Sequence, residues 1–468
     1  MEPEHEQQQS ECKHEQQQQG VGVLGSLPSE LDRNIIRQSG LFMQFNLFDT
    51  AVTPLKQATT PCRDIKKQVL YDLFTAYYDA RKYKRNTNSA LSFERNYESS
   101  LFELYENIIN RTYQIKTSIC FINYAPVQRE IFAAHFCDRI VHHLVYNYIS
   151  PIFERVFIND SYSCRKGKGT SSGINRINHF IKSCSDNYQK DCYILKLDIK
   201  GYFMAINRQL LFDKTKNILE KFRTRTFKQT DGSLLTWEQS FDFDTVYYLL
   251  EKIIFNNPVD NFLRKGSMNN WEGLPPSKSL FHSDIGCGLP IGNLTSQLFS
   301  NIYLNEFDRW VHYKQNCKFF GRYVDDFVII HNDKEFLKCL IQKIRAFLKE
   351  ELLLELHPKK IYLQHYSKGV QFLGTVIKPH RIYIANRTKG NFYEALEKQN
   401  IIARHHKPSK EEQNNFLSSM NSYLGIMKHY KTYNLRKRMI NKKLSAWWWN
   451  YVYSTGGLSK FLLKSKPR

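Results

Sequence analysis

The sequence predicts an α+β protein in which strands and helices follow one another in mixed order, without the regular βαβ alternation of a doubly wound sheet. Apolar residues recur at helical spacing over residues 60–115, and short apolar runs further along the chain are typical of strands. A chain of 468 residues is too long for one ordinary core. We therefore expect two or three packed subdomains that contain both kinds of element.

The N-terminal segment differs in composition from the rest of the chain. It reads "MEPEHEQQQSECKHEQQQQG", which is acidic, rich in Gln and without an apolar segment of the signal-peptide kind. We expect residues 1–25 to form a disordered tail. No run approaches the ~20 consecutive apolar residues of a membrane span, so we expect a cytoplasmic protein without membrane contact. The ten cysteines show no CxxC spacing, which predicts reduced thiols.

The elements of the first half of the chain follow from local patterns. After the helices of residues 60–115, a hairpin with a proline-containing turn is predicted around 119–137. A helix follows at "CDRIVHHLVYNYISPIFERVF", and then the basic, glycine-rich loop "DSYSCRKGKGT" opens into another helix. The apolar strand "CYILKLDIKGYF" comes next, and it ends on the carboxylate of Asp198.

The second half begins with a long connection over residues 225–285, which is rich in Asn, Pro and Gly and which we interpret as an insertion. "GCGLPIGNLTSQLFSNIYLNEFDRWV" starts as a turn and continues as a helix, and "GRYVDDFVII" reads as a hairpin. The remaining predicted elements are the helix "EFLKCLIQKIRAFLKEELL" and the short strands "KIYLQ" and "VQFLGTVI".

Positive charge is concentrated at the C-terminal end. The chain carries a formal charge of +22, and residues 378–468 contribute 19 Lys or Arg against 4 Glu. This segment also has interleaved aromatic residues and helical apolar spacing in "FLSSMNSYLGIMKHY". A solvated basic tail is one interpretation. A basic, aromatic, helical surface that binds a nucleic-acid backbone fits the pattern better.

Three aspartates are the candidate catalytic residues. Asp198 ends one apolar strand, and Asp325 and Asp326 lie at the tip of a hairpin, so the three converge if these strands pair. Their mutual repulsion would raise a pKa or open the fold unless a cation is bound. Mg²⁺ prefers such oxygens, and two ions can clamp the oxygens of an in-line phosphoryl displacement. Taken alone, however, two adjacent Asp residues are commonly ordinary turn formers.

The motifs as a set resemble those of reverse transcriptases over roughly residues 70–445. "LKLDIKGYF", "GLPIGNLTSQLFSNIYLNEFD", "GRYVDDFVII", "LELHPKKIYL" and "GVQFLGTVI" resemble palm motifs A to E, in the expected order. The resemblance implies a right-hand polymerase fold with an antiparallel palm sheet. It places N-terminal helices and fingers at 26–190, the palm at 191–377 with the insertion, and a basic helical thumb and C-terminal tail at 378–468.

One position narrows the subgroup. Gly292 and Ser296 are followed by Gln297, where group II intron enzymes normally have Pro. The sequence is similar here to the reverse transcriptases of bacterial diversity-generating retroelements and related, partly antiviral, lineages. Mutagenic retrohoming with an accessory protein and phage defence with a non-coding RNA both remain open.

The resemblance also implies roles for single residues. Asp198 and Asp325 would hold two Mg²⁺ ions, for which Mn²⁺ could substitute, with Asp326 beside them and the Ile199 carbonyl as a further ligand. Phe203 would exclude a ribose 2′-OH, although Tyr202 could serve equally well or Phe203 could be core packing. The other predicted nucleotide contacts are Arg129 for the triphosphate, Gln297, and Lys360 as a proton donor to pyrophosphate. Gln297 could instead make a hydrogen bond at a helix N-terminus, and Lys359 rivals Lys360.

Two basic clusters are predicted to contact nucleic acid. The first is the loop with Arg165, Lys166 and Lys168, and the second is the thumb segment with Arg436, Lys437 and Arg438. The implied function is RNA-templated DNA synthesis, with an RNA template, a DNA or RNA primer, deoxynucleoside triphosphates, and a non-coding RNA or accessory subunit as partners. The alternatives are a catalytically silent RNA-binding scaffold of the same fold and an RNA-dependent RNA polymerase.

Overall fold

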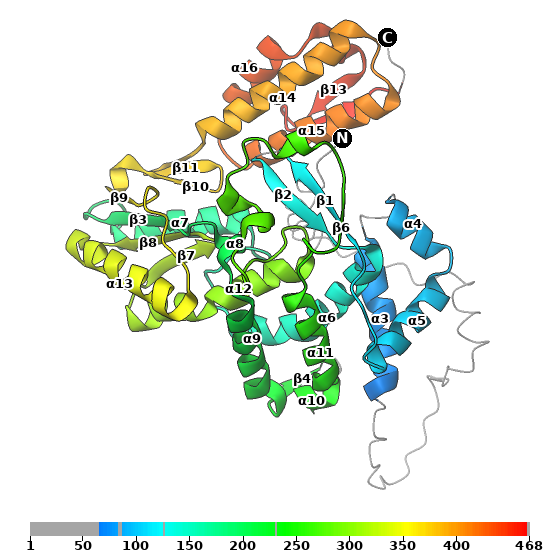
Figure 1. The fold of residues 1–468 in the computed structure, drawn as a ribbon. Helices are drawn as coiled ribbons and strands as arrows, with labels where there is room; N and C mark the ends of the chain where they lie inside the picture. The colour runs from blue at the N-terminus through cyan, green and yellow to red at the C-terminus, as the bar shows by residue number, and fades with distance from the viewer. Residues whose placement is uncertain (1–64, 83–86, 125–126, 230–231, 466–468) are drawn as a thin grey trace, which may run out of the picture.

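The computed structural model of the protein describes residues 65–82, 87–124, 127–229 and 232–465. The predicted tail over residues 1–25 lies outside these ranges. The described chain forms three units (Figure 1), and a cleft lies between them. Helices and antiparallel sheets occur in mixed order, which confirms the α+β prediction.

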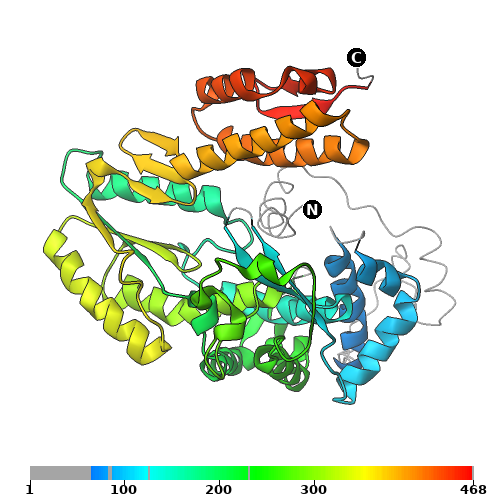
Figure 2. The same ribbon diagram turned by 45° about the horizontal axis from the view of Figure 1, so that its top comes forward.

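The palm is built on a four-stranded antiparallel sheet in the order β7–β8–β3–β9. Apolar residues at alternate and neighbouring positions of the two central strands are buried on both faces of this sheet. Helix α7 covers one face, and α12 and α13 cover the other (Figure 2). The elements are β3 (Tyr193–Asp198), β7 (Phe319–Tyr323), β8 (Asp326–His331), β9 (Tyr362–His365), α7 (Thr170–Cys184), α12 (Leu294–Arg309) and α13 (Lys334–Leu352).

The N-terminal helices share the main core with the palm, whereas Cys120 and Phe132 of the fingers hairpin pack in a smaller cluster with Met204 and Leu280. Strands β1 and β2 form the predicted antiparallel hairpin, and β6 adds to β1 in parallel. The long helix α6 runs beneath them with an almost wholly apolar buried face. The elements are α3 (Ile65–Arg81), α4 (Asn88–Glu94), α5 (Tyr97–Ile109), β1 (Ser118–Asn123), β2 (Arg129–Ala133) and α6 (Phe136–Glu154).

Residues 225–285 are not the structureless connection that their composition predicts. Helix α11 (Phe243–Phe255) buries Val246, Leu249 and Ile254 in the main core beside α9. Further on, Glu130 of β2 is 1% exposed and accepts hydrogen bonds from Trp271 Nε1 (2.7 Å) and the Leu280 backbone N–H (2.6 Å). A buried carboxylate thus ties this segment to the fingers. The segment and its neighbours contain α8 (Tyr202–Ala205), α9 (Arg208–Arg223), β4 (Thr226–Lys228), β5 (Leu234–Thr236), α10 (Trp237–Ser240), β6 (Phe262–Arg264) and the 3₁₀ turns η2 (Met268–Trp271), η3 (Pro276–Lys278) and η4 (Leu280–His282).

The thumb has a core of its own. Phe392, Phe416, Met420 and Trp448 are buried together, and Phe416 stacks on Trp448 at 4.2 Å between ring centroids. A three-stranded sheet of β10, β11 and β12 leads into it, and a short hairpin of β13 and β14 that the sequence did not predict closes it. The elements are β10 (Val370–Phe372), β11 (Thr375–Lys378), β12 (Arg381–Ile384), α14 (Asn386–His405), α15 (Lys410–Met427), α16 (Tyr433–Lys443), η7 (Ala446–Asn450), β13 (Val452–Thr455) and β14 (Lys460–Leu463); the π-helical turn η5 (Trp310–Lys314) and the 3₁₀ turn η6 (Tyr366–Lys368) lie earlier in the palm.

Two sequence-level expectations concern chemistry rather than architecture. The eight cysteines within the described ranges form no disulfide, as expected; Cys12 and Cys62 lie outside those ranges. In the described part of the chain, no helix has both the length and the apolar character needed to cross a membrane.

Candidate active site

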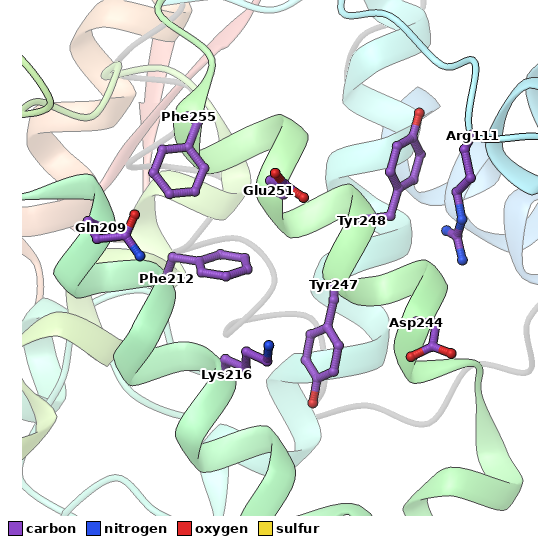
Figure 3. Close-up of a pocket in the computed structure, with 9 residues that line it drawn as sticks. All are labelled: Arg111, Gln209, Phe212, Lys216, Asp244, Tyr247, Tyr248, Glu251 and Phe255. Carbon is purple, nitrogen blue, oxygen red and sulfur yellow. The ribbon is translucent and has the colours of Figure 1, made fainter.

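A cleft of about 2710 Å³ lies between fingers, palm and thumb. Its lining includes the hairpin of β1 and β2, the end of β3, the β7–β8 turn, and the facing sides of α14 and α15. A second, smaller hollow of about 650 Å³ lies between α9 and α11, where aromatic and charged side chains face one another (Figure 3). None of the described residues that line this hollow is a predicted site residue. The cleft is therefore the candidate site.

Strand pairing brings the three aspartates together in the cleft. Strands β3 and β8 pair antiparallel with Asp198 directly opposite Asp326, and Asp325 precedes Asp326 in the turn. All three line the cleft and are half-buried. Burial, and after it the negative charge of Asp198, raise the pKa of Asp325 to about 6. Burial also raises the pKa of Asp326 to about 6, although Lys196 opposes this shift.

Two lysines pair with these carboxylates. Lys360 Nζ lies 2.9 Å from Asp198 Oδ2, and Lys196 Nζ lies 3.0 Å from Asp326 Oδ2. Lys360 was predicted to lie in the site, whereas Lys196 was missed. Side chains alternate along a strand, so Lys196 and Asp198 of β3 share one face. That two-residue spacing was the available signal. The rival Lys359 also lines the cleft, but its side chain makes no contact with the aspartates within the described structure.

The turn that carries Asp325 is held in an unusual conformation. Val324 has φ +56°, a left-handed conformation that costs a β-branched residue about 1–3 kcal/mol. Its carbonyl accepts a hydrogen bond from Arg322 Nη1 (2.8 Å), and its N–H donates to Ser163 Oγ (3.2 Å). Both backbone polar groups of Val324 are thus bound by buried side chains. These contacts fix the direction in which Asp325 projects.

Arg322 itself belongs to a fully buried ion pair. Its guanidinium donates to both oxygens of Asp308 on α12, at 2.6 and 2.7 Å, and neither side chain is exposed. It also contacts Asn301 (3.3 Å) and Ser161 (3.3 Å). Burial alone would lower the pKa of Arg322, but the negative charge of Asp308 raises it, so the guanidinium stays charged. Burial raises the pKa of Asp308, and the charge of Arg322 opposes this shift. The sequence analysis did not single out either residue.

Both aromatic residues after Asp198 border the cleft, but they differ in exposure. Tyr202 is 3% exposed, and its hydroxyl donates to the Ser300 carbonyl at 2.6 Å. Phe203 is half-buried. The side chain of Ile199 is buried, while the residue borders the cleft. Phe203 is thus the more exposed of the two rings.

Arg129 and Gln297 differ in their placement. Arg129 is half-buried at the start of β2 and lines the cleft. Burial lowers its pKa while the charge of Asp325 opposes this, which indicates that the two groups interact across the cleft. Gln297 is half-buried in the first turn of α12 and is not among the described residues that line the cleft.

The two predicted basic clusters need correction. Arg165 is 6% exposed; its guanidinium binds Glu154 (2.9 Å), the Ile158 carbonyl (2.6 Å) and the Ser161 carbonyl (3.0 Å). These contacts commit it to the interior, so it does not reach a phosphate backbone. Of the neighbouring lysines, Lys168 lines the cleft and Lys166 is exposed outside that lining.

The thumb cluster is placed differently from the prediction as well. Arg436 is 7% exposed and donates to the Leu458 carbonyl at 2.6 Å. Lys437 and Arg438 are exposed, but they are not among the described residues that line the cleft. The thumb residues on the cleft side that carry positive charge are Arg387, Lys398, Lys428 and Lys460. Helical spacing alone did not reveal which face of the thumb turns inward.

The carboxylates suit a divalent cation in their chemistry. Among the described residues, no three His, Cys, Asp or Glu side chains are gathered in an arrangement that could hold a metal ion. Lysines pair with two of the three aspartates. However, Asp326 Oδ1 is buried without a hydrogen-bond partner within the described structure. Together with the repulsion between Asp198 and Asp325, this oxygen fits the ligand preference of a hard cation.

Comparisons with known proteins agree with this architecture. The family model described as reverse transcriptase (RNA-dependent DNA polymerase) matches residues 128–377, which is more than half of the chain. Protein YkfC of Escherichia coli (strain K12) is 22% identical over 269 residues, which cover 51% of this chain and 60% of that protein. The chain thus spans about three fifths of the length of this curated relative.

Among solved structures, the apo telomerase of Candida tropicalis has a TM-score of 0.43 and 12% identity, covering 74% of this chain and 64% of that one. Telomerase from Candida albicans, solved with a fragment of telomeric RNA, has a TM-score of 0.41 and 12% identity, with 73% and 63% covered.

We predict that removing Arg322 alone destabilises the fold more than removing both Arg322 and Asp308. Arg322→Met leaves a buried, unpaired carboxylate, so the free energy of unfolding should fall by about 3–5 kcal/mol. The double substitution Arg322→Met with Asp308→Leu should recover most of this loss. Urea unfolding followed by circular dichroism measures both.

Lys338→Met, which removes an exposed pair with Glu335, serves as the matched control and should cost less than about 1 kcal/mol. A loss for Arg322→Met as small as that of the control would contradict the prediction.

We also predict that Asp325→Asn stabilises the metal-free protein at neutral pH. The folded-state pKa of about 6 lies above the unfolded value of about 3.9, so this carboxyl destabilises the fold increasingly as pH rises through that window. In EDTA at pH 7.5, the variant should gain about 1–2 kcal/mol, which allows for screening of a half-exposed group. Near pH 4 the gain should vanish.

Exposed Asp213→Asn is the control, with little change at either pH. If Asp325→Asn destabilises the protein at pH 7.5, the carboxyl has a structural role instead.

Proposed function

This chain belongs to the reverse transcriptase family, and we propose that it is an RNA-templated DNA polymerase that adds deoxynucleotides to a primer by two-metal phosphoryl transfer. The observation that carries the proposal is the β3–β8 register, which sets Asp198 opposite Asp326 beside Asp325 in the cleft. In the reaction, the primer 3′-oxygen forms a bond to the α-phosphorus of the nucleotide. The bond between the α- and β-phosphates breaks, and pyrophosphate leaves.

Divalent metal chemistry fits the donor set of this site. Asp198, Asp325 and the Ile199 carbonyl would hold two Mg²⁺ ions, or Mn²⁺ in their place, with Asp326 beside them. Such ions stabilise the negative charge on the attacking and leaving oxygens when bound. Lys360 must then release Asp198, from which it is 2.9 Å away. Its freed ammonium would protonate the departing pyrophosphate, and its position supports this role over one for Lys359.

The remaining roles concern the nucleotide and its template. Arg129 would bind the triphosphate, a task suited to a planar side chain with several donors. The Phe203 ring, which lines the cleft, would clash with a ribose 2′-OH and so select deoxynucleotides. Gln297 would act on the base pair only after a movement that brings it to the cleft. Arg387, Lys398, Lys428 and Lys168 would contact the phosphates of the template–primer duplex without reading its sequence.

The cellular setting follows from the subgroup resemblance at Ser296 and Gln297. We propose a bacterial retroelement or an antiviral defence system, with a non-coding RNA or an accessory protein as a partner. A catalytically silent scaffold of the same fold is the competing function, and the lysine pairs on Asp198 and Asp326 are the observation in its favour.

The decisive test of catalysis is the variant Asp325→Asn with Asp326→Asn. We expect Mg²⁺-dependent deoxynucleotide incorporation on an RNA template to be lost by at least about 10³-fold, because the charge that would hold the metal is gone. Binding of template–primer, measured by fluorescence anisotropy, should persist. Thermal melting checks that the variant folds.

Exposed Asp213→Asn again controls for the loss of a carboxylate. Wild-type protein that binds template–primer but incorporates no nucleotide under any divalent metal would favour the scaffold. Preferred incorporation of ribonucleotides would favour an RNA-dependent RNA polymerase.

We expect Phe203→Val to relax sugar selectivity. The ring is lost while the backbone carbonyl of residue 203, which accepts from the Leu289 N–H (2.8 Å), stays in place. Discrimination between deoxynucleotides and ribonucleotides, measured as a ratio of kcat/KM values, should fall by about tenfold or more.

Tyr202→Phe is the matched control, because it removes only the hydroxyl that bonds to the Ser300 carbonyl. Its sugar selectivity should stay at the wild-type level. A loss of selectivity in Tyr202→Phe but not in Phe203→Val would assign the discrimination to the hydroxyl of Tyr202 instead.

A further inference from the structure

Only part of the positive charge of the thumb lies on the side that lines the cleft. After Glu412 the sequence contains no Asp or Glu, but it contains eleven Lys or Arg. Within the described residues beyond Glu412, only Lys428 and Lys460 of these cations line the cleft. Most of the remaining charge lies elsewhere on the thumb, with no acidic side chain of the same segment to neutralise it.

Helix α16 carries much of this charge on exposed side chains. Its buried side consists of Arg436, Met439 and Ile440, which face the thumb core. Lys437, Arg438 and Lys442 are exposed on the other side of the helix, and Lys443 is exposed at its C-terminal end. No carboxylate among the described residues forms an ion pair with these four side chains. In both views α16 lies on the side of the thumb that is turned away from the palm sheet (Figures 1 and 2).

Three aromatic rings on α16 and on the elements that follow it are also exposed. Tyr433 at the start of α16 is 48% exposed, one helical turn before Lys437. Trp447, just beyond the end of the helix, is 61% exposed, and Tyr453 of β13 is 42% exposed. The neighbouring Trp448, by contrast, is fully buried in the thumb core. Packing of the thumb therefore accounts for Trp448 but not for Trp447.

We define the outer thumb surface as Tyr433, Lys437, Arg438, Lys442, Lys443, Trp447 and Tyr453, and we propose that it binds single-stranded RNA separately from the cleft. Unpaired cations bind phosphates by releasing counterions, and rings stack on unpaired bases without regard to sequence. An acidic protein would satisfy the cations but would not explain the exposed rings. This second RNA site goes beyond the proposed polymerase function, which needs only the cleft.

The test measures binding of single-stranded RNA while a template–primer occupies the cleft. Protein is saturated with an unlabelled RNA–DNA template–primer, and a fluorescent single-stranded RNA of 20 nucleotides and mixed sequence is then titrated by anisotropy. Wild type should bind this probe while the cleft is occupied. The variant Lys437→Gln, Arg438→Gln, Lys442→Gln, Lys443→Gln should flatten the log–log salt slope by about 2–3. Trp447→Ala should weaken binding by about fivefold or more.

A cleft variant provides the matched control. Arg387→Gln with Lys398→Gln and Lys428→Gln should weaken template–primer binding but leave probe binding to the filled protein unchanged. Conversely, the outer variant should keep wild-type nucleotide addition on saturating template–primer. If the protein proves inactive, both binding measurements still decide the inference. Thermal melting shows whether the fourfold Gln variant folds. If it does not fold, Trp447→Ala and the double variant Lys442→Gln, Lys443→Gln are measured in its place.

Three outcomes overturn the inference. The template–primer could prevent probe binding, which would assign both RNAs to the cleft. The outer variants could bind the probe as wild type does, which would leave the surface as solvated charge. Polyglutamate could compete as well as the RNA at equal charge, which would favour an acidic protein as the partner.

Discussion

The buried ion pair between Arg322 and Asp308 is the interaction on which the site depends. Removing two charges from water costs several kcal/mol per ion, and this is offset only where further hydrogen bonds satisfy the remaining donors. Arg322 meets that condition because its guanidinium also reaches Asn301, Ser161 and the Val324 carbonyl. One side chain thereby joins α12, the segment after α6 and the β7–β8 turn. The strained peptide that aims Asp325 into the cleft is an extension of this network.

Unlike the Arg322–Asp308 pair, the carboxylates of the site lower the stability of the fold. Asp325 and Asp326 carry raised pKa values because the fold buries negative charge that it does not fully neutralise. Lys196 and Lys360 offset part of that repulsion through contacts to Asp326 and Asp198. The fold thus preserves a locally unfavourable arrangement that bound cations would relieve, which is the usual relation between a reactive site and the stability of its scaffold. The rigid Arg322 network makes that arrangement tolerable.

Local patterns predicted the elements whose periodicity is complete in the sequence, such as α6, α13 and the β7–β8 hairpin. The positions of Asp198 at a strand end and of Asp325 and Asp326 at a hairpin tip predicted that the three carboxylates would converge if those strands paired. Helix α11 was missed because Asn, Pro and Gly dominate the composition around it, although its own residues are apolar. Arg165 and Arg436 were misjudged for a different reason. A cation in a basic run looks exposed, yet burial depends on partners supplied by distant residues, such as Leu458 for Arg436. Gln297 shows that even a matching motif does not determine where a side chain points.

The same limit applies to the charge of the thumb, whose distribution over the surface could not be predicted from the sequence. A composition of eleven cations without a carboxylate after Glu412 indicates a polyanionic partner, but it does not say how many faces are involved. Packing divides the segment, because α14 and α15 turn polar side chains and a few cations to the cleft while α16 turns its charge outward. The exposed cations of α16 are not among the described residues that line the cleft, so a duplex bound there would not contact them. Charge on the outer side therefore needs an explanation separate from the cleft.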